Sequence, residues 1–467
     1  MAQKANIPFS IYRTSRIPMF EQICSAIRQA IIDGDLVEGT KLAPSRSFAA
    51  DLGVSRSTIV TVYDQLCAEG YITSVPRSGM LVCAISETQF KPRQEIQNRF
   101  EDEVQTLPQP LLGGQPDMEL FPHRQWAKAV AKVCRTNPQA MLLGGGRFGN
   151  FELRKAIASH VLDWRGIEAS PHQIIITAGS TDALGICIRT LAKAGDSIGL
   201  ENPGYPPVRN FAKAMQLAPV DLKIGDQGAE VPLPGQTPRL SILTPSNQSP
   251  LGGVMSPRRR QEFVAWAKRH KAWIIEDDYD SEFRYAGHPI PALAGFDHLD
   301  RTIYVGSFAK IFSNLLRIGY LIVPAELIGK FRVSLERFGF SASYMPQQAL
   351  AEFIQTGAFY HHLRKVRRIY KERRKYLIGR LSADLAEFGW FTDHQAGMQI
   401  AFHLRTSFQD TVVSEKAEKL GVTAQPLSSF GTDDASYNGL ILGFCNYTEP
   451  EIDRAVATLR QVMLGQY

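Results

Sequence analysis

The spacing of apolar residues changes near residue 83, and the two regions predict different structures. In the first region an apolar stripe at helical spacing runs from Phe20 to Ile31 and ends at Asp33-Gly34, which predicts an amphipathic helix. A second helix can begin at Ser45, after a proline, and a third can be capped by Ser55. Because only the short turn at Gly53-Val54 separates these two helices, the pattern predicts a helix-turn-helix.

Two short apolar runs follow the third helix and predict strands at Tyr71–Thr73 and Met80–Val82, with Arg77-Ser78-Gly79 at their tip, like the wing of a winged helix. Arg46 and Arg56 fall at the starts of the second and third helices. Local charge is nearly balanced, with eight Lys and Arg against seven Asp and Glu in residues 1–83. The placement of the arginines therefore favours DNA binding over a small helical domain without that role.

Residues 1–83 resemble a GntR-type winged helix-turn-helix DNA-binding domain. The resemblance rests on three stretches, Gly39–Arg46, Leu52–Thr58 and Glu69–Ile72. It implies DNA contacts by the side chains of Arg46, Arg56, Ser57, Thr58 and Arg77. Residues 84–110 are polar, mixed in charge and end in two closely spaced prolines, so we expect a linker there.

From residue 111 to residue 467, short and continuously apolar runs alternate with helical stretches. Strands that are buried on both faces have this pattern, which predicts an α/β domain with a mostly parallel sheet. The expected strands are 174–177, 197–200, 240–244, 273–275, 302–305 and 319–323. Ligands of such sheets bind beyond the carboxyl ends of the strands.

Polar and aromatic side chains follow five of these runs directly. In chain order they include Ser180, Thr181, Tyr205, Asn247, Asp277, Tyr279, Ser307 and Lys310. Packing alone does not require this placement, so we expect one assembled site. Taken singly, Lys310 could be a solvated loop lysine, and Asp277, Asp278 and Asp280 could be a solvated acidic turn or a weak metal site.

The combination suits pyridoxal phosphate, which needs a lysine for its aldehyde, a carboxylate for its pyridine nitrogen, and a helix start with an arginine for its phosphate. Residues 111–467 resemble fold-type-I aminotransferases over almost their whole length. The resemblance implies Lys310 as the Schiff-base lysine, Asp277 on the pyridine nitrogen, Asn247 and Tyr279 near the ring hydroxyl, Tyr205 stacked on the ring, and Ser180, Thr181, Ser307 and Arg317 at the phosphate.

Together the two domains resemble the MocR/PdxR branch of GntR-type transcription regulators, of which Ile274–Tyr285 is especially typical. The resemblance implies that the aminotransferase-like domain senses a small amine, or pyridoxal phosphate itself, while the winged helix reads operator DNA. An effector amine would release Lys310 from the cofactor and shift the protein between two conformations. The resemblance also implies a head-to-tail homodimer, because fold-type-I sites usually form at a subunit interface.

One position departs from the aminotransferase pattern. Many aminotransferases clamp the substrate carboxylate with an arginine near the C-terminus, and the matching stretch here, Gly439–Phe444, has Ile441 at that place. This weakens the case for amino-acid transamination, with Arg209 as a possible substitute anchor. Two other hypotheses stay open: a working aminotransferase with an added DNA-binding domain, and a DNA-binding protein whose larger domain has lost the cofactor.

Composition narrows the class of protein further. A length of 467 residues with 44% apolar and 21% charged residues fits two or three ordinary domains, and a net charge of +6 permits nucleic-acid binding without requiring it. The six cysteines include no Cys-x-x-Cys pair, which argues against a zinc site or a disulfide framework and fits the cytoplasm. We expect no metal, and no membrane span because the chain has no apolar run of about 18 residues.

Overall fold

The computed structural model describes residues 12, 15, 17–84, 109–137, 139, 146–314, 316–339, 342–432 and 437–466. The chain divides into two compact units, Met1–Gln105 and Thr106–Tyr467, which we call the head and the body. Residues 85–108 of the expected linker lie outside the described residues, so the boundaries proposed for the linker stay a prediction.

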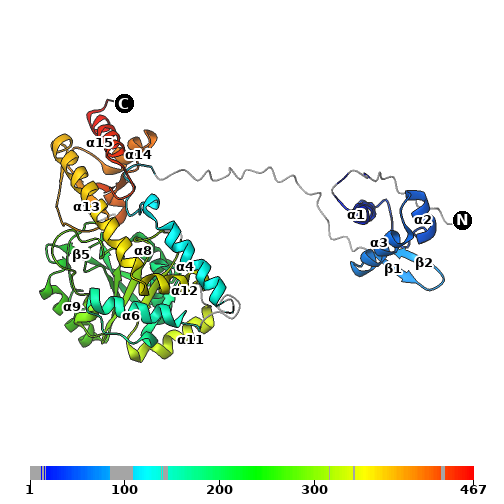
Figure 1. The fold of residues 1–467 in the computed structure, drawn as a ribbon, viewed down its shortest axis with the longest axis horizontal. Coiled ribbons are helices and arrows are strands. Elements are labelled where there is room, and N and C mark those ends of the chain that lie inside the picture. Colours follow the sequence, from blue (N-terminus) through cyan, green and yellow to red (C-terminus); the bar gives the residue numbers. More distant parts are fainter. Residues whose placement is uncertain are drawn as a thin grey trace. The chain divides into compact units, whose positions relative to one another are not determined.

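The head is a winged helix-turn-helix, as the sequence predicts (Figure 1). Its elements are α1 (Met19–Ile32), α2 (Ser45–Leu52), α3 (Arg56–Ala68), β1 (Ile72–Val75) and β2 (Gly79–Val82). The apolar stripe of α1, including Ile23 and Ile27, is buried in one core with Ile59 and Leu66 of α3. Burying each such side chain contributes roughly 1.5–3 kcal/mol, which holds this small core together.

Local signals set the ends of the head's elements. Gly53 ends α2 with a φ of 62°, which glycine adopts without steric cost. Ser55 caps α3, since its Oγ accepts a hydrogen bond from the backbone N–H of Thr58 at 3.1 Å. The strands β1 and β2 pair antiparallel up to Val75 and Gly79, which leaves Arg77 at the tip of the hairpin.

The body is built on a sheet with the strand order β3-β10-β9-β8-β7-β4-β5-β6. The strands are β3 (Ile174–Thr177), β4 (Ser197–Asn202), β5 (Ala218–Gly225), β6 (Gly228–Ala229), β7 (Leu240–Leu243), β8 (Trp273–Asp278), β9 (Thr302–Ser307) and β10 (Gly319–Ile322). Neighbours from β5 through β9 run parallel, whereas β10 runs antiparallel to both β9 and β3. The predicted mostly parallel α/β sheet is confirmed, with the last predicted strand reversed.

Both faces of this sheet are covered. Successive residues of β3 belong to different cores: Ile174 and Ile176 pack in one cluster and Ile175 in the other. The first cluster includes side chains of α6 (Phe151–Arg165), α12 (Met345–Gln355) and α13 (Ala358–Asp384). The second includes side chains of α7 (Ser180–Leu191), α8 (Pro206–Ala214) and α11 (Ile328–Phe338). Burial on both faces explains why the strands are continuously apolar.

A smaller antiparallel sheet with the order β11-β12-β14-β13 forms near the C-terminus. Its strands are β11 (Gly389–Phe391), β12 (Gln399–Leu404), β13 (Gln425–Pro426) and β14 (Gly439–Gly443), with α14 (Asp410–Lys419) and α15 (Glu449–Leu464) in the same region (Figure 1). In the part of the chain that the structure describes, the other elements are α4 (His123–Thr136), α9 (Pro257–His270), α10 (Leu293–Phe296) and 3-10 turns at Met118–Leu120, Pro171–Gln173, Ala325–Leu327 and Leu427–Phe430. Within the described residues, no helix is both long and apolar enough to cross a membrane.

Candidate functional site

A cavity of about 580 Å³ lies at the carboxyl ends of β3, β4, β8 and β9. All the predicted cofactor residues except Asn247 line it: Ser180, Thr181, Tyr205, Asp277, Tyr279, Ser307, Lys310 and Arg317. Met398, Gln399 and Gln425, which belong to or adjoin β12 and β13, also line it. The cavity therefore has walls from both sheets of the body.

Lys310 presents its amine inside this cavity. Its Nζ donates a hydrogen bond to the backbone oxygen of Gly114 at 2.7 Å. Burial lowers the pKa of the lysine, partly offset by the nearby Asp280, Cys445 and Asp277, and a lower pKa makes the neutral, nucleophilic amine more available. Gly114 has a φ of +67°, and a Cβ there would lie 3.0 Å from the lysine Nζ, so glycine leaves room for the amine.

Asp277 lies in β8 and is buried at the cavity wall. Burial raises the pKa of its carboxyl to about 7, with smaller contributions from Asp278 and Glu201, while Lys310 lowers it. The Oδ1 atom is buried without a hydrogen-bond partner among the described residues. Such an atom is rare in folded proteins, and here it belongs to a residue that lines a cavity large enough for a ligand.

The side of the cavity near α7 has the features of an anion site. Ser180 and Thr181 form the first turn of this helix, whose unpaired backbone N–H groups and dipole favour negative charge. Arg317 adds a cation to the lining and is exposed. Its φ of 47° lies in the left-handed region that few residues other than glycine adopt, so its backbone is strained beside the cavity.

The two predicted tyrosines line the cavity, but the predicted asparagine does not. The Tyr205 hydroxyl lies 3.2 Å from Thr181 Oγ1. The Nδ2 atom of Asn247 donates to the Tyr279 hydroxyl at 3.1 Å and to Asp280 Oδ1 at 2.8 Å. Ser249, two residues further on, lines the cavity instead. Burial raises the pKa of Tyr279, and the Ser249 side chain partly offsets this effect.

Many aminotransferases have an arginine that binds the substrate carboxylate where this chain has Ile441, and the structure confirms that the surroundings of this residue are apolar. Ile441 is fully buried in β14, opposite Ala401 and Gln425, and packs in a small apolar cluster with Leu427. The possible substitute, Arg209, lines a smaller neighbouring cavity of about 200 Å³. Its guanidinium forms an ion pair with Asp221 at 2.7 Å.

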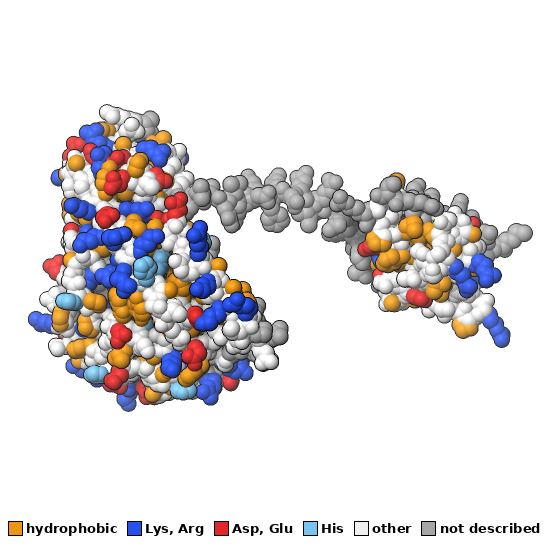
Figure 2. All heavy atoms as spheres, in the orientation of Figure 1, with side chains coloured by type: hydrophobic (Ala, Val, Ile, Leu, Met, Phe, Trp, Pro, Cys, Tyr) orange, Lys and Arg blue, Asp and Glu red, His pale blue; other side chains and the backbone are white. Residues whose placement is uncertain are grey.

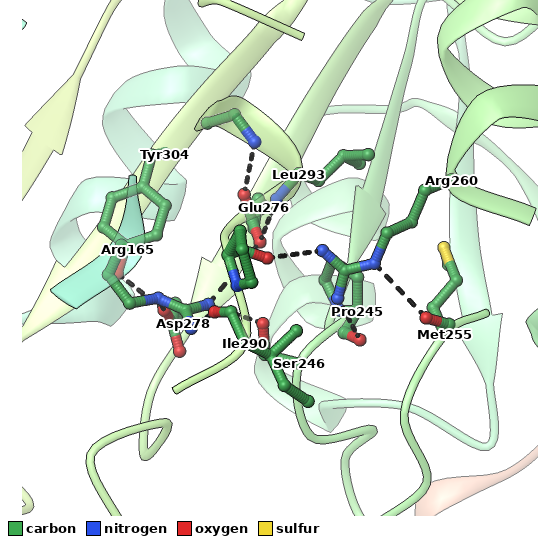
Figure 3. Close-up of polar contacts among 12 residues, drawn as sticks. Arg165, Pro245, Ser246, Met255, Arg260, Glu276, Asp278, Ile290, Leu293 and Tyr304 are labelled. Atoms are coloured by element: carbon green, nitrogen blue, oxygen red, sulfur yellow. Dashed lines mark hydrogen bonds and ion pairs between the residues drawn. The ribbon is translucent and has the colours of Figure 1, made fainter. Parts of the chain in front are cut away.

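A buried polar network surrounds Glu276 and Asp278 of β8, and sequence reasoning missed it (Figure 3). Because side chains alternate along a strand, these two carboxylates lie on the opposite face of β8 from Asp277. Arg165, at the end of α6, forms an ion pair with Asp278 at 2.7 Å and donates to Ser246 at 2.5 Å. Tyr304 also donates to Asp278, at 2.6 Å. Glu276 accepts two backbone N–H groups at the start of α10, from Leu293 and Ala294. A signal was present, since three consecutive acids in an apolar strand require partners.

The head residues predicted to contact DNA differ in exposure. Arg46, in the first turn of α2, Arg56, the first residue of α3, and Arg77, at the hairpin tip, are exposed. Ser57 is exposed and Thr58 is half-buried, and their hydroxyls lie 2.7 and 2.8 Å from the capping Ser55 Oγ. Figure 2 shows Lys and Arg side chains gathered at one edge of the visible face of the head.

Comparisons with known proteins match both units. The family described as bacterial regulatory proteins, gntR family, matches residues 20–82, and aminotransferase class I and II matches residues 113–459. The chain is 33% identical to the probable rhizopine catabolism regulatory protein MocR of Rhizobium meliloti, over 97% of this chain and 95% of that protein. It is 32% identical to the HTH-type pyridoxine biosynthesis transcriptional regulator PdxR of Corynebacterium glutamicum, over 99% and 100%.

Among solved structures, an archaeal alanine:glyoxylate aminotransferase is similar to this chain with a TM-score of 0.72 and 26% identity. The similarity covers 78% of this chain and 92% of that protein.

We predict that Arg165→Leu lowers the free energy of unfolding of the body by about 3–5 kcal/mol, because it leaves Asp278 buried without its cationic partner. The matched control is Arg258→Leu, which removes an exposed i,i+4 pair with Glu262 on α9 and should cost less than about 1 kcal/mol. Chemical unfolding followed by circular dichroism measures both. Equal losses in the two variants would contradict a buried charge network.

We also predict that the ligand-free body loses stability as the pH rises. Burial raises the pKa of Glu201 and Asp277 to about 7 and that of Asp280 to about 8, above the unfolded values of about 4. The folded state therefore binds more protons than the unfolded state between about pH 4 and 8, and stability falls as the pH rises through that window. Melting temperatures from pH 5 to 8.5 should fall, and less steeply in Asp277→Asn.

Proposed function

We propose a function from the family to which this chain belongs, the MocR-type subfamily of GntR-family regulators with an aminotransferase class I and II domain. In this proposal the body senses a small amine through pyridoxal phosphate, and the head binds operator DNA. Membership rests on the match of both domains and on relatives that align over almost the whole chain. These relatives are named as transcriptional regulators or regulatory proteins, which supports a regulatory role for this chain.

The observation that carries the cofactor proposal is the unpaired Oδ1 of Asp277 in the same cavity as Lys310 Nζ. The N–H of a protonated pyridine ring would give this carboxylate the hydrogen bond that it lacks. The positive charge of the ring would also favour the ionised form of Asp277 over its protonated form. The start of α7 and Arg317 supply the complementary site for a phosphate. The residues present therefore fit the group.

Pyridoxal phosphate, when bound, supplies an aldehyde carbon that a primary amine can attack. Lys310 would hold that carbon, and Asp277 would hold the proton on the ring nitrogen. Ser180, Thr181, Ser307 and Arg317 would bind the phosphate, Tyr205 would cover the ring, and Tyr279 with Ser249 would lie at its hydroxyl, with Asn247 orienting Tyr279. An effector amine would compete with Lys310 for the same carbon. Such an amine can shift the protein between two conformations only to the extent that its affinity for the two differs.

For the head, we propose that Arg56, Ser57 and Thr58 at the start of α3 approach the major groove, while Arg46 and Arg77 contact the flanking backbone. The exposure of the three arginines supports this arrangement. We propose a head-to-tail homodimer, as in the fold-type-I resemblance, so that two heads read two half-sites. We propose that the protein is cytoplasmic, because it would bind operator DNA there.

A working aminotransferase is the second candidate, and Lys310 with Asp277 is the observation that favours it. The apolar Ile441 at the expected clamp weighs against it, because an amino-acid substrate needs a cation for its carboxylate. Turnover with a keto acid at ordinary enzyme rates, on the order of 1 to 1000 per second, would favour the enzyme. A spectral change that is stoichiometric with the amine, without turnover, would favour the regulator.

Lys310→Ala is expected to abolish the visible absorbance of lysine-linked pyridoxal and all borohydride-stable attachment, because the chain then has no amine at the aldehyde. Lys371→Ala, which changes an exposed lysine on α13, is the matched control and should keep both. Absorbance spectra and peptide mass spectrometry after reduction measure the two properties. A pyridoxyl group trapped on another lysine, or none in the wild type, would overturn the cofactor proposal.

Arg56→Ala is expected to weaken operator binding about tenfold or more, in line with the 1–3 kcal/mol that a good base contact contributes. Genomic fragments selected by the wild-type protein serve as the probe in gel-shift titrations at fixed salt. Arg28→Ala is the control, since Arg28 lies in α1 of the same head and pairs with Glu69 at 2.8 Å. Unchanged binding by Arg56→Ala would remove this arginine from the interface, and pyridoxal content should not change in either variant.

A further inference from the structure

The end of the cavity formed by the smaller sheet has its own chemical character. We call this part the amide wall and define it as Gln399, Gln425 and Ser429, all of which line the cavity. A Cβ at Gly114 would lie 3.0 Å from Lys310 Nζ and 3.9 Å from Gln399 Oε1, so the lysine amine and this amide adjoin the same glycine. The amide wall is therefore placed to meet whatever is attached to an amine at Lys310.

The lining that this one chain supplies leaves no unassigned cation for the amide wall, and Arg209, which lines the neighbouring cavity with Ser429, is paired with Asp221. Among the described lining residues, the cationic side chains are Lys310 and Arg317, and both are assigned to the cofactor by the proposed function. Asp277 and Asp280 add carboxyl groups, and no cation, to the same lining. Gln425 lies directly opposite the buried Ile441 in the sheet register. A carboxylate brought here would lose water without gaining a cationic partner, which is costly.

Hydroxyl and amide groups meet a different environment at the amide wall. Each glutamine offers two N–H donors and a carbonyl acceptor. Neither Gln399 nor Gln425 makes a side-chain hydrogen bond with another described residue, whereas Ser429 Oγ donates to the Pro426 oxygen at 2.7 Å and keeps its acceptor capacity. The wall therefore presents free donors and acceptors that carry no charge.

We infer that the effector is a primary amine whose other polar groups are uncharged hydroxyls or amides, and not an amino acid with a free carboxylate. The inference rests on the proposed function, because it takes the cavity to hold pyridoxal phosphate and to admit an amine. It adds the class of effector, which follows from the amide wall and from the absence of an uncommitted cation in the described lining.

The test compares two sets of amines on the full-length protein loaded with pyridoxal phosphate. Serinol and glucosamine carry uncharged oxygen groups besides the amine, and we call them the neutral probes. L-alanine, γ-aminobutyrate and taurine carry a carboxylate or sulfonate besides the amine, and we call them the anionic probes. Binding is followed by the absorbance of the cofactor and, independently, by titration calorimetry. The neutral amines are expected to bind at least about tenfold more tightly, the factor given by one lost hydrogen bond to a polar partner.

Three variants locate the preference. Gln399→Leu and Gln425→Leu should each weaken binding of the neutral probes about tenfold while cofactor absorbance stays unchanged, because neither glutamine is among the residues proposed to hold the cofactor. Gln425→Arg places a cation opposite Ile441 and should improve binding of the anionic probes about tenfold or more. Gln261→Ala, an exposed glutamine of α9, is the control and should change neither set.

The preference of the wild-type protein for neutral over anionic probes tests the inference even if a variant fails to fold. Equal or tighter binding of the anionic probes overturns the inference, as does a lack of response to both neutral probes up to 10 mM, roughly the weakest affinity of interest. Unchanged neutral binding in both leucine variants also overturns it. A protein that takes up no pyridoxal phosphate would instead overturn the proposed function, so the two failures are distinguishable.

Discussion

Three consecutive carboxylates at the end of a buried strand are the constraint on which the rest of the body depends. In a strand, successive side chains point to opposite faces, so Glu276 and Asp278 lie on one side of β8 and Asp277 on the other. The outer two are satisfied: Arg165 and Tyr304 meet Asp278, and backbone N–H groups of α10 meet Glu276 (Figure 3). The middle carboxylate belongs to a residue that lines the cavity, and one of its oxygens has no partner among the described residues.

Two of the three carboxylates therefore make their contacts within the fold, and the middle one lines the cavity, where a ligand can reach it. Burying the first and third acids is partly compensated within the protein, by charge and by hydrogen bonds, although burial still raises the pKa of Glu276. Burial of the second is not compensated, and its pKa is raised to about 7 as a result. A ligand that carries a protonated nitrogen therefore has a specific favourable interaction waiting for it.

The fold was accessible from the sequence where burial has a simple pattern. Runs such as 174–177 and 302–305 are apolar at every position because both faces of the sheet are covered, and their polar successors converge because parallel strands share an end. The strand β5 was missed because most of its residues are exposed or half-buried, and the smaller sheet was missed because its strands are short and joined from distant segments.

The site was accessible only in part, for a related reason. Side chains that follow a strand directly could be predicted, but the turn after β7 has no regular alternation, so the sequence did not tell that Ser249 and not Asn247 lines the cavity. Gly114 and Gln425 have no local signal at all, because their meaning comes from tertiary approach to Lys310 and Ile441. The cavity thus joins two sheets. A ligand that contacts Lys310 and the amide wall together would therefore contact both sheets, and it can shift the protein only if its affinity differs between two conformations.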